Sequence, residues 1–170
     1  DILKCFDQLS RTLMAAVLKL AGYPESIVDA YLRFHSELHT YNTIAGGLGS
    51  PYNKRCSIPQ GCPFSMCLLA LLLRPIILLV EVPGKIHAWI LADDIAIIAL
   101  GDTTLTLLTE KVNILFEFVH DLGSKLAPKK SFLFSSDSAA RDWLKNFKWA
   151  VIDCKLTVVT NFRYLGAHLN

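Results

Sequence analysis

Two adjacent aspartates, Asp93 and Asp94, interrupt an apolar stretch that runs from Trp89 to Ile98. A surface turn normally uses Gly or Asn at such a place, and aspartate is a poor strand residue. The two carboxylates repel each other, and a divalent cation bound between them and another acid removes that repulsion. The pair therefore indicates a metal site, with a solvated turn as the alternative on this segment alone.

Four other segments combine acids, amines or an amide with short apolar runs. They are Asp1 to Asp7, residues 58–65 with Gln60 and Gly61, residues 126–131 with Lys129 and Lys130, and residues 162–166 with Tyr164 and Gly166. Each segment is a weak signal when it is taken alone. Together with the aspartate pair, and in this order, they form a much stronger pattern.

The five segments resemble the palm motifs of reverse transcriptases, most closely those of non-LTR (LINE-type) retrotransposons. The family patterns are D-x-x-K-A-F-D, P-Q-G-x-P-x-S, [FY]-A-D-D, a lysine after N-x-x or P-x-x, and Y-L-G, and the match covers nearly the whole chain. Four positions depart from them: Leu91 and Ala127 replace an aromatic residue and Asn, Cys5 replaces Ala, and Met66 stands where Pro is common. None of these departures removes a carboxylate.

The resemblance implies an RNA-directed DNA polymerase, which transfers dNTPs to the 3′-hydroxyl of a primer. Asp1 and Asp93 would be the principal ligands of two Mg²⁺ ions, with Asp94 assisting and Mn²⁺ as an alternative ion. Two metals about 4 Å apart can activate the primer oxygen and offset the charge of the leaving pyrophosphate. Magnesium prefers hard oxygen ligands, which suits carboxylates.

The resemblance also implies substrate-binding residues. Phe6 would lie under the incoming sugar and exclude a 2′-hydroxyl, with an ordinary core aromatic as the alternative. Gln60 and Gly61 would lie beside the nucleotide and the template, where a missing side chain permits close backbone approach. Lys130 matches the lysine near the triphosphate, although Lys129 or a simply solvated lysine is an alternative.

The metal site requires tertiary structure, because Asp1 and Asp93 are far apart in sequence. We expect the strand that starts at Asp1 to pair beside the hairpin 86–100, with carboxylate oxygens within roughly 4–7 Å of each other. Asp94 is expected at the turn. Carboxylate oxygens more than about 10 Å apart, or a sheet in which the two strands are not neighbours, would defeat the two-metal site and with it the polymerase mechanism. Tyr164 matches the primer-grip region, and a plain hairpin strand explains it equally well.

The rest of the sequence predicts the elements that position these residues. We expect helices over 10–21, 24–38, 65–80, from an Asp102 cap to Gly123, and 138–147; strands over 1–7, 86–91, 95–100, 131–135, 155–160 and 162–169; and a glycine turn between two short strands within 41–60. This order predicts one α+β domain over residues 1–170, a polymerase palm with a ferredoxin-like core. Its sheet would be mostly antiparallel, with helices on one face.

His35 and His39 lie one helical turn apart without a third ligand nearby, which favours a surface helix over a metal pair.

Composition limits the alternatives. With 52% hydrophobic and 19% charged residues, the chain is too apolar for a disordered segment. The run 66–80 is shorter than the roughly 20 residues that cross a bilayer and contains Arg74 and Pro75, which favours a buried helix over a membrane span. The net charge of +2 predicts no strong nucleic-acid affinity for this piece alone. Five cysteines without paired spacing indicate reduced thiols.

The resemblance implies an RNA template, a DNA primer and dNTPs as partners, together with fingers and a thumb from the same polypeptide. We therefore expect the piece alone not to polymerise, and an intracellular location that is nuclear for a eukaryotic retroelement. A catalytically silent palm remnant, serving as a structural or RNA-binding piece, is the main alternative. The intact Asp1, Asp93 and Asp94 argue against decay. A small apolar-ligand or membrane-associated α/β domain is a third reading.

Overall fold

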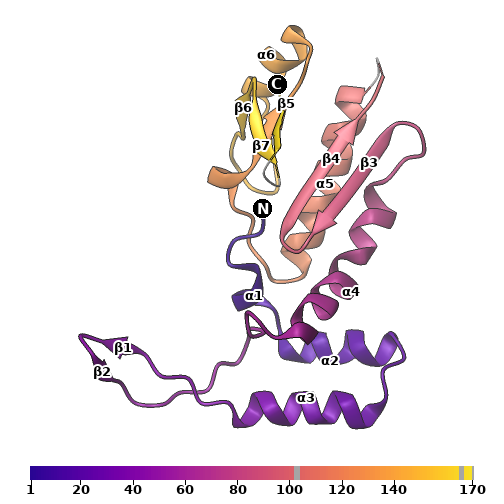
Figure 1. Ribbon diagram of the computed structural model, residues 1–170. Helices are drawn as coiled ribbons and strands as arrows, with labels where there is room; N and C mark the ends of the chain where they lie inside the picture. Colours follow the sequence, from indigo (N-terminus) through magenta and orange to yellow (C-terminus); the bar gives the residue numbers. More distant parts are fainter. Residues whose placement is uncertain (102–103, 165–166, 170) are drawn as a thin grey trace. The chain divides into compact units, whose positions relative to one another are not determined.

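The computed structural model describes residues 1–101, 104–164 and 167–169 (Figure 1). The chain forms two compact units. Lys4–Pro75 make up the N-terminal unit, and Asp1–Leu3 together with Ile76–Asn170 make up the C-terminal unit.

The N-terminal unit begins with helices α1 (Cys5–Gln8), α2 (Arg11–Leu20) and α3 (Glu25–Glu37). The Ser10 side chain accepts a hydrogen bond from the Leu13 amide and so caps α2, as its residue type predicts. Pro24 precedes α3, and the two longer helices contact each other. Both helices are confirmed within a residue or two. Their buried apolar side chains are Met14, Leu18 and Val28.

The predicted strand over residues 1–7 is wrong beyond Leu3. Lys4 adopts a left-handed conformation with φ 46°, and α1 follows at once. The carbonyl groups of Phe6 and Leu9 accept hydrogen bonds from the amides of Ile58 and Ser57. These bonds to the loop satisfy the backbone without a strand ladder.

Strands β1 (Thr43–Ile44) and β2 (Gly47–Leu48) form a small antiparallel hairpin. The residues between them, Ala45 and Gly46, both have positive φ, at 49° and 82°. Such a turn matches the twist of two antiparallel strands. The predicted glycine turn is therefore confirmed.

Helix α4 (Pro63–Val80) contains Pro75 and carries a buried apolar stripe. Among the described residues it is the one helix long and apolar enough to cross a membrane, and 39% of it is buried. A core helix of a soluble protein passes the same test of length and composition. The helix is buried along one face only, while Leu78 is 78% exposed. The buried side chains are Leu68, Leu69, Leu72, Leu73, Ile76 and Val80.

The C-terminal unit contains a hairpin of β3 (Ile86–Leu91) and β4 (Asp94–Ala99), with α5 (Thr104–Asp121) against β4 (Figure 1). Side chains alternate along β3, so that Ile86 and Ala88 are buried while Trp89 and Leu91 are exposed. The predicted strands and helix are confirmed here. The cap expected at Asp102 lies outside the described residues.

Beyond α5 the unit continues with a 3₁₀ turn (Pro128–Lys130), β5 (Phe132–Phe134), α6 (Ser138–Asn146), β6 (Thr157–Val159), β7 (Phe162–Tyr164) and β8 (Ala167–Leu169). β5 pairs parallel with β6, and β7 pairs antiparallel with β8. The stretch 162–169 was predicted as one strand and is instead two.

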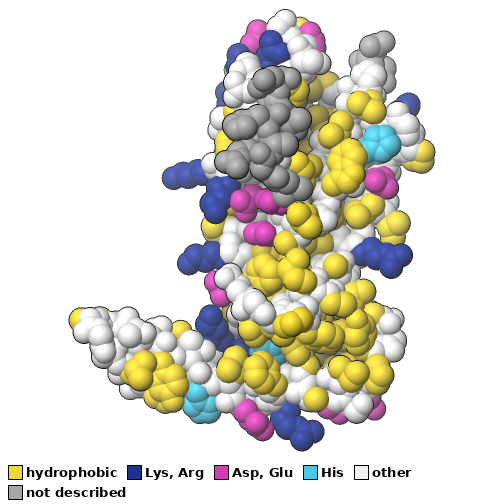
Figure 2. Space-filling view, in the orientation of Figure 1, with side chains coloured by type: hydrophobic (Ala, Val, Ile, Leu, Met, Phe, Trp, Pro, Cys, Tyr) yellow, Lys and Arg dark blue, Asp and Glu magenta, His cyan; other side chains and the backbone are white. Residues whose placement is uncertain are grey.

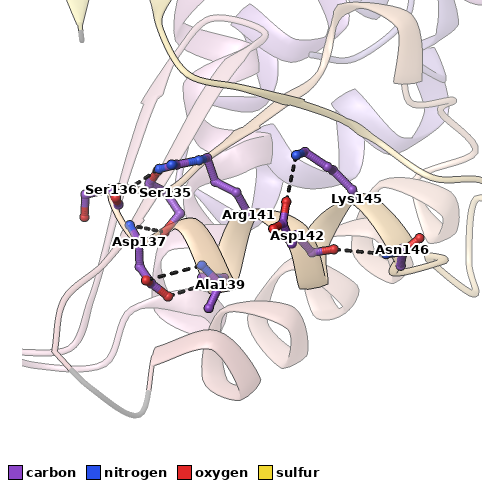
Figure 3. A network of polar contacts seen from close by, with 9 residues as sticks. Ser135, Ser136, Asp137, Ala139, Arg141, Asp142, Lys145 and Asn146 are labelled. Atoms are coloured by element: carbon purple, nitrogen blue, oxygen red, sulfur yellow. Dashed lines mark hydrogen bonds and ion pairs between the residues drawn. The ribbon is translucent and has the colours of Figure 1, made fainter.

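The start of α6 is fixed by a local polar network (Figure 3). The Asp137 carboxylate accepts hydrogen bonds from the amides of Ala139 and Ala140, which is the N-cap geometry. The Arg141 guanidinium donates to the carbonyls of Ser135 and Ser136, at 2.7 and 2.9 Å. Each of these charges is satisfied locally, so this surface offers little unpaired charge to a ligand.

The described residues contain four strand pairs, three of them antiparallel, interspersed with helices. The predicted α+β fold with mostly antiparallel pairing is therefore confirmed. The strands form four separate two-stranded sheets in the described part of the chain, where one larger sheet was expected.

Candidate functional site

The aspartate pair lies at the turn of the β3–β4 hairpin. Ala92 and Asp93 form the connection, and Leu91 pairs with Asp94 across it. Ala92 has φ 55°, a left-handed conformation that costs a residue with a Cβ about 1 kcal/mol. Asp93 is half-buried and Asp94 is exposed. Asp94, expected at the turn, is the first residue of β4 and directly follows the two turn residues.

Asp1 lies next to a short antiparallel bridge that is separate from the four strand pairs. The Ala127 amide donates to the Asp1 carbonyl at 3.0 Å, the Leu3 amide donates to the Lys125 carbonyl at 2.8 Å, and Ile2 bridges antiparallel to the intervening residue. The expected pairing of this strand with the hairpin is therefore wrong, since the hairpin is a two-stranded sheet in the described residues. The strand pairing thus fails the condition set for the two-metal site. The chain turns away at Lys4, so the extended segment is too short for a longer ladder.

Within the described residues, no group of three or more His, Cys, Asp or Glu side chains could hold a metal ion. The oxygen separation expected between Asp1 and Asp93 stays a prediction. Mg²⁺ is commonly held by one or two carboxylates, with waters and substrate phosphates completing its shell. The two carboxylates at the hairpin turn fit that donor set.

Lys129 and Lys130 follow residues 125–127, the segment that is hydrogen-bonded to Asp1 and Leu3. The Lys130 amide donates to the Ala127 carbonyl at 2.9 Å, and the Ala127 amide is the one bonded to Asp1. Both lysine side chains are exposed. The 3₁₀ turn Pro128–Lys130 therefore directly follows the segment that is hydrogen-bonded to Asp1. The choice between Lys129 and Lys130 stays a prediction.

Gln60 and Gly61 are the central residues of a tight turn in the N-terminal unit. The Cys62 amide donates to the Pro59 carbonyl at 3.3 Å, and Gly61 has φ 87°. A turn with positive φ at its third residue strongly favours glycine there. The Ser65 hydroxyl also donates to the Pro59 carbonyl, at 2.8 Å, so the turn is tied to the first residues of α4.

Phe6 lies close to this turn within the same unit, because its carbonyl accepts from the Ile58 amide at 2.9 Å. The Phe6 side chain is half-buried and Gln60 is exposed. The structure thus groups the predicted sugar-contacting residue with the predicted template-contacting turn. The described contacts of Phe6 are compatible with a core aromatic as well.

Tyr164 has a neighbour that sequence reasoning missed. It lines an open apolar groove of about 480 Å³ together with Trp89, Ile90, Leu91 and Ile98. Burial raises the pKa of Tyr164, and the negative charge of Asp94 raises it further. The Y-L-G motif was the only sequence signal at this position, and it gave no indication of contact with the aspartate hairpin.

A second feature that sequence reasoning missed is a buried polar cluster in the N-terminal unit. His35 is 1% exposed, and neither ring nitrogen has a hydrogen-bond partner among the described residues. Its ring meets that of Tyr31 edge-on, with centroids 4.3 Å apart. The surface prediction holds for His39 and is wrong for His35, because helical periodicity alone did not show which face of α3 is covered.

Arg11 stabilises this cluster of His35 and Tyr31, because its guanidinium donates hydrogen bonds to the carbonyls of His35 and Ser57, at 2.9 and 3.4 Å. Burial lowers the pKa of His35, and the Arg11 charge lowers it further. Burial raises the pKa of Tyr31 to about 12, with a smaller electrostatic contribution from the neighbouring Cys62. The cluster therefore favours a neutral histidine and a neutral tyrosine.

An α+β chain that presents two adjacent carboxylates at a hairpin turn carries donors of the kind that bind a divalent cation. The family model described as "Reverse transcriptase (RNA-dependent DNA polymerase)" matches residues 1–169. The chain therefore belongs to the reverse transcriptase family, whose members are RNA-directed DNA polymerases. No curated protein sequence matches the chain significantly.

Proposed function

We propose that this chain is the catalytic palm of a non-LTR retrotransposon reverse transcriptase, acting by two-metal nucleotidyl transfer. The observation that carries the proposal is the pair Asp93 and Asp94 on a turn whose first residue is a strained alanine, inside a family match over residues 1–169. Strained backbone is retained where the surrounding structure fixes it, and such places are frequently functional. The fingers and thumb would come from the same polypeptide, and the isolated palm would not polymerise.

Asp93 and Asp94 would hold the metal ions, with Asp1 as a further ligand. Bound there, Mg²⁺ would offset phosphate charge and favour the ionised primer hydroxyl. The assignment of Asp1 as a ligand is based on its sequence match alone. The assignment of Asp93 and Asp94 is based on the sequence match and on the geometry of the hairpin turn.

The other site residues would place the substrates. Lys130 would contact the negatively charged triphosphate, and Gly61 would let the template or nucleotide approach the backbone. Phe6 would stand against the sugar. An RNA template, a DNA primer and dNTPs would be the partners, and a eukaryotic element would place the enzyme in the nucleus.

Primer extension on an RNA template tests the proposal, using the protein as its gene encodes it. Asp93→Asn should lower the rate of synthesis by about a hundredfold, because the change removes a metal-binding charge. Asp142→Asn is the matched control, since this exposed carboxylate on α6 pairs with Lys145 at 2.8 Å. That control should stay within about twofold of the unaltered protein.

Binding of Mn²⁺, followed by electron paramagnetic resonance, gives a second readout that does not depend on catalysis. Asp93→Asn and Asp94→Asn should each weaken Mn²⁺ binding, while Asp142→Asn should leave it unchanged. Retained RNA binding without any metal-dependent extension by the unaltered protein would instead identify a catalytically silent palm.

A further inference from the structure

The hydroxyl group of Tyr164 is buried and has no hydrogen-bond partner among the described residues. A phenol hydroxyl removed from water without a partner destabilises a protein, and most buried hydroxyl groups have one. The unpaired Tyr164 hydroxyl is explained if its hydrogen-bond partner moves into place only when a ligand binds.

The lining of the groove beside β3 indicates which side chain could accept this hydrogen bond. Tyr164 is the last residue of β7, and it lines the groove together with Leu91. Leu91 is the direct cross-strand partner of Asp94. Because cross-strand partners share a face of the sheet, a side chain packed at Leu91 is close to Asp94.

The residue types that line the groove also favour a hydrogen bond between Tyr164 and Asp94. Its remaining walls are hydrophobic, and Figure 2 shows hydrophobic side chains exposed over the hairpin. Trp89 carries another side-chain donor in this lining, but it pairs with Ala96, two positions further from the turn. The negative charge of Asp94 contributes to the raised pKa of Tyr164, which places the two groups within electrostatic reach.

We infer that Tyr164 is a positioning residue for Asp94, whose carboxylate accepts a hydrogen bond from the tyrosine hydroxyl when that carboxylate binds a cation. The inference rests on the proposed function, since it assigns a supporting group to one of the proposed metal ligands. A carboxylate has two oxygens, so one can face the cation while the other accepts from the phenol. Apolar walls strengthen such a hydrogen bond, because they lower the local dielectric constant.

The test uses Tyr164→Phe in the protein as its gene encodes it, with primer and template bound. This change removes the hydroxyl and keeps the ring in the groove. Mn²⁺ affinity should fall about tenfold or more, as expected for the loss of a hydrogen bond to a charged group. In primer extension the Mg²⁺ concentration at half-maximal rate should rise by a similar factor, with KM for dNTP unchanged.

Tyr52→Phe is the matched control, because its hydroxyl donates to the Asn42 side chain on the exposed β1–β2 hairpin. It should leave Mn²⁺ affinity unchanged. The melting temperature of Tyr164→Phe should not fall, because the change removes an unpaired buried hydroxyl. Trp89→Phe removes the neighbouring donor and should leave Mn²⁺ affinity unchanged as well.

Combining Tyr164→Phe with Asp94→Asn separates the two proposals. If Tyr164 acts through Asp94, Tyr164→Phe weakens Mn²⁺ binding in the unaltered background and has no further effect beside Asp94→Asn. If Asp94→Asn weakens binding but Tyr164→Phe does not, the positioning role is overturned and the proposed function stands. If neither Asp93→Asn nor Asp94→Asn changes Mn²⁺ binding or synthesis, the proposed metal site fails, and the inference fails with it.

Discussion

The two units of the chain place their chemically active groups in opposite settings. In the C-terminal unit, Asp93 and Asp94 lie at a half-buried to exposed turn. In the N-terminal unit, His35 is buried with both ring nitrogens unpartnered in the described part of the chain. Exposed acids keep their hydration and can exchange water for a cation at modest cost, whereas a buried histidine resists charge. The aspartate pair is therefore suited to bind a cation, whereas the surroundings of His35 favour its neutral form.

The cores should respond differently from the surfaces, and the C-terminal core gives the largest expected effect. Trp149 is fully buried and meets Phe116 and Phe147 edge-on, with ring centroids 5.3 and 4.8 Å apart. Trp149→Ala should lower the free energy of unfolding by about 3–5 kcal/mol, because it leaves a cavity. Chemical denaturation measures this.

Trp143→Ala is the matched control, since Trp143 is 44% exposed in the same unit. It should cost about 1 kcal/mol, mainly through its stacking on Phe147. Equal losses for the two tryptophans would contradict the burial pattern.

Selection of the sugar should be separable from metal binding, since Phe6 lies in the N-terminal unit and Asp93 and Asp94 lie in the C-terminal unit. Phe6→Val should raise ribonucleotide incorporation relative to deoxyribonucleotides by about tenfold, because the ring no longer excludes the 2′-hydroxyl. The measurement is the ratio of the two kcat/KM values, with Mn²⁺ affinity as the control that should not change. An unchanged ratio would make Phe6 a core residue.

The buried histidine predicts a pH dependence of stability in the N-terminal unit. The pKa of His35 is lowered in the folded chain, so the unfolded chain binds the proton more readily. Stability is fully present above the unfolded pKa of about 6.5 and is lost as the pH falls below it towards the folded pKa. The loss should be at most about 1.4 kcal/mol per pH unit.

Urea denaturation at several pH values tests this dependence. His35→Leu should flatten the stability profile below pH about 6.5, because it removes the group that titrates. His39→Leu is the control and should keep the slope, since His39 is exposed on the same stretch of chain. A slope that survives His35→Leu would assign the effect to another group.

The two turns give the smallest expected effects. Gly61→Ala should destabilise the N-terminal unit by about 1 kcal/mol, since Gly61 has φ 87°. Ala92→Gly should change stability by less than about 0.5 kcal/mol, because relief of strain opposes the entropy of an added glycine. Thermal unfolding compares them. Gly47→Ala is the control for the first change, because its Cβ would meet Ile44 at an ordinary 3.6 Å and its φ is not positive.

The sequence alone determined the family, the α+β class, and most helices and strands. These features depend on local signals: the Ser10 cap, Gly46 between β1 and β2, and the apolar runs on either side of Asp93 and Asp94. Such signals act over a few residues, so they survive without knowledge of the rest of the chain.

Tertiary structure decided what those local signals do not encode. It paired the Asp1 segment with residues 125–127, buried His35 on α3, and placed Tyr164 in a groove with Leu91 of the β3–β4 hairpin. Each depends on which segments meet across many residues, and helical or strand periodicity does not specify the partner of a face. Short extended segments can pair with several others at similar local cost, so the choice between the hairpin and residues 125–127 followed from packing of the whole chain.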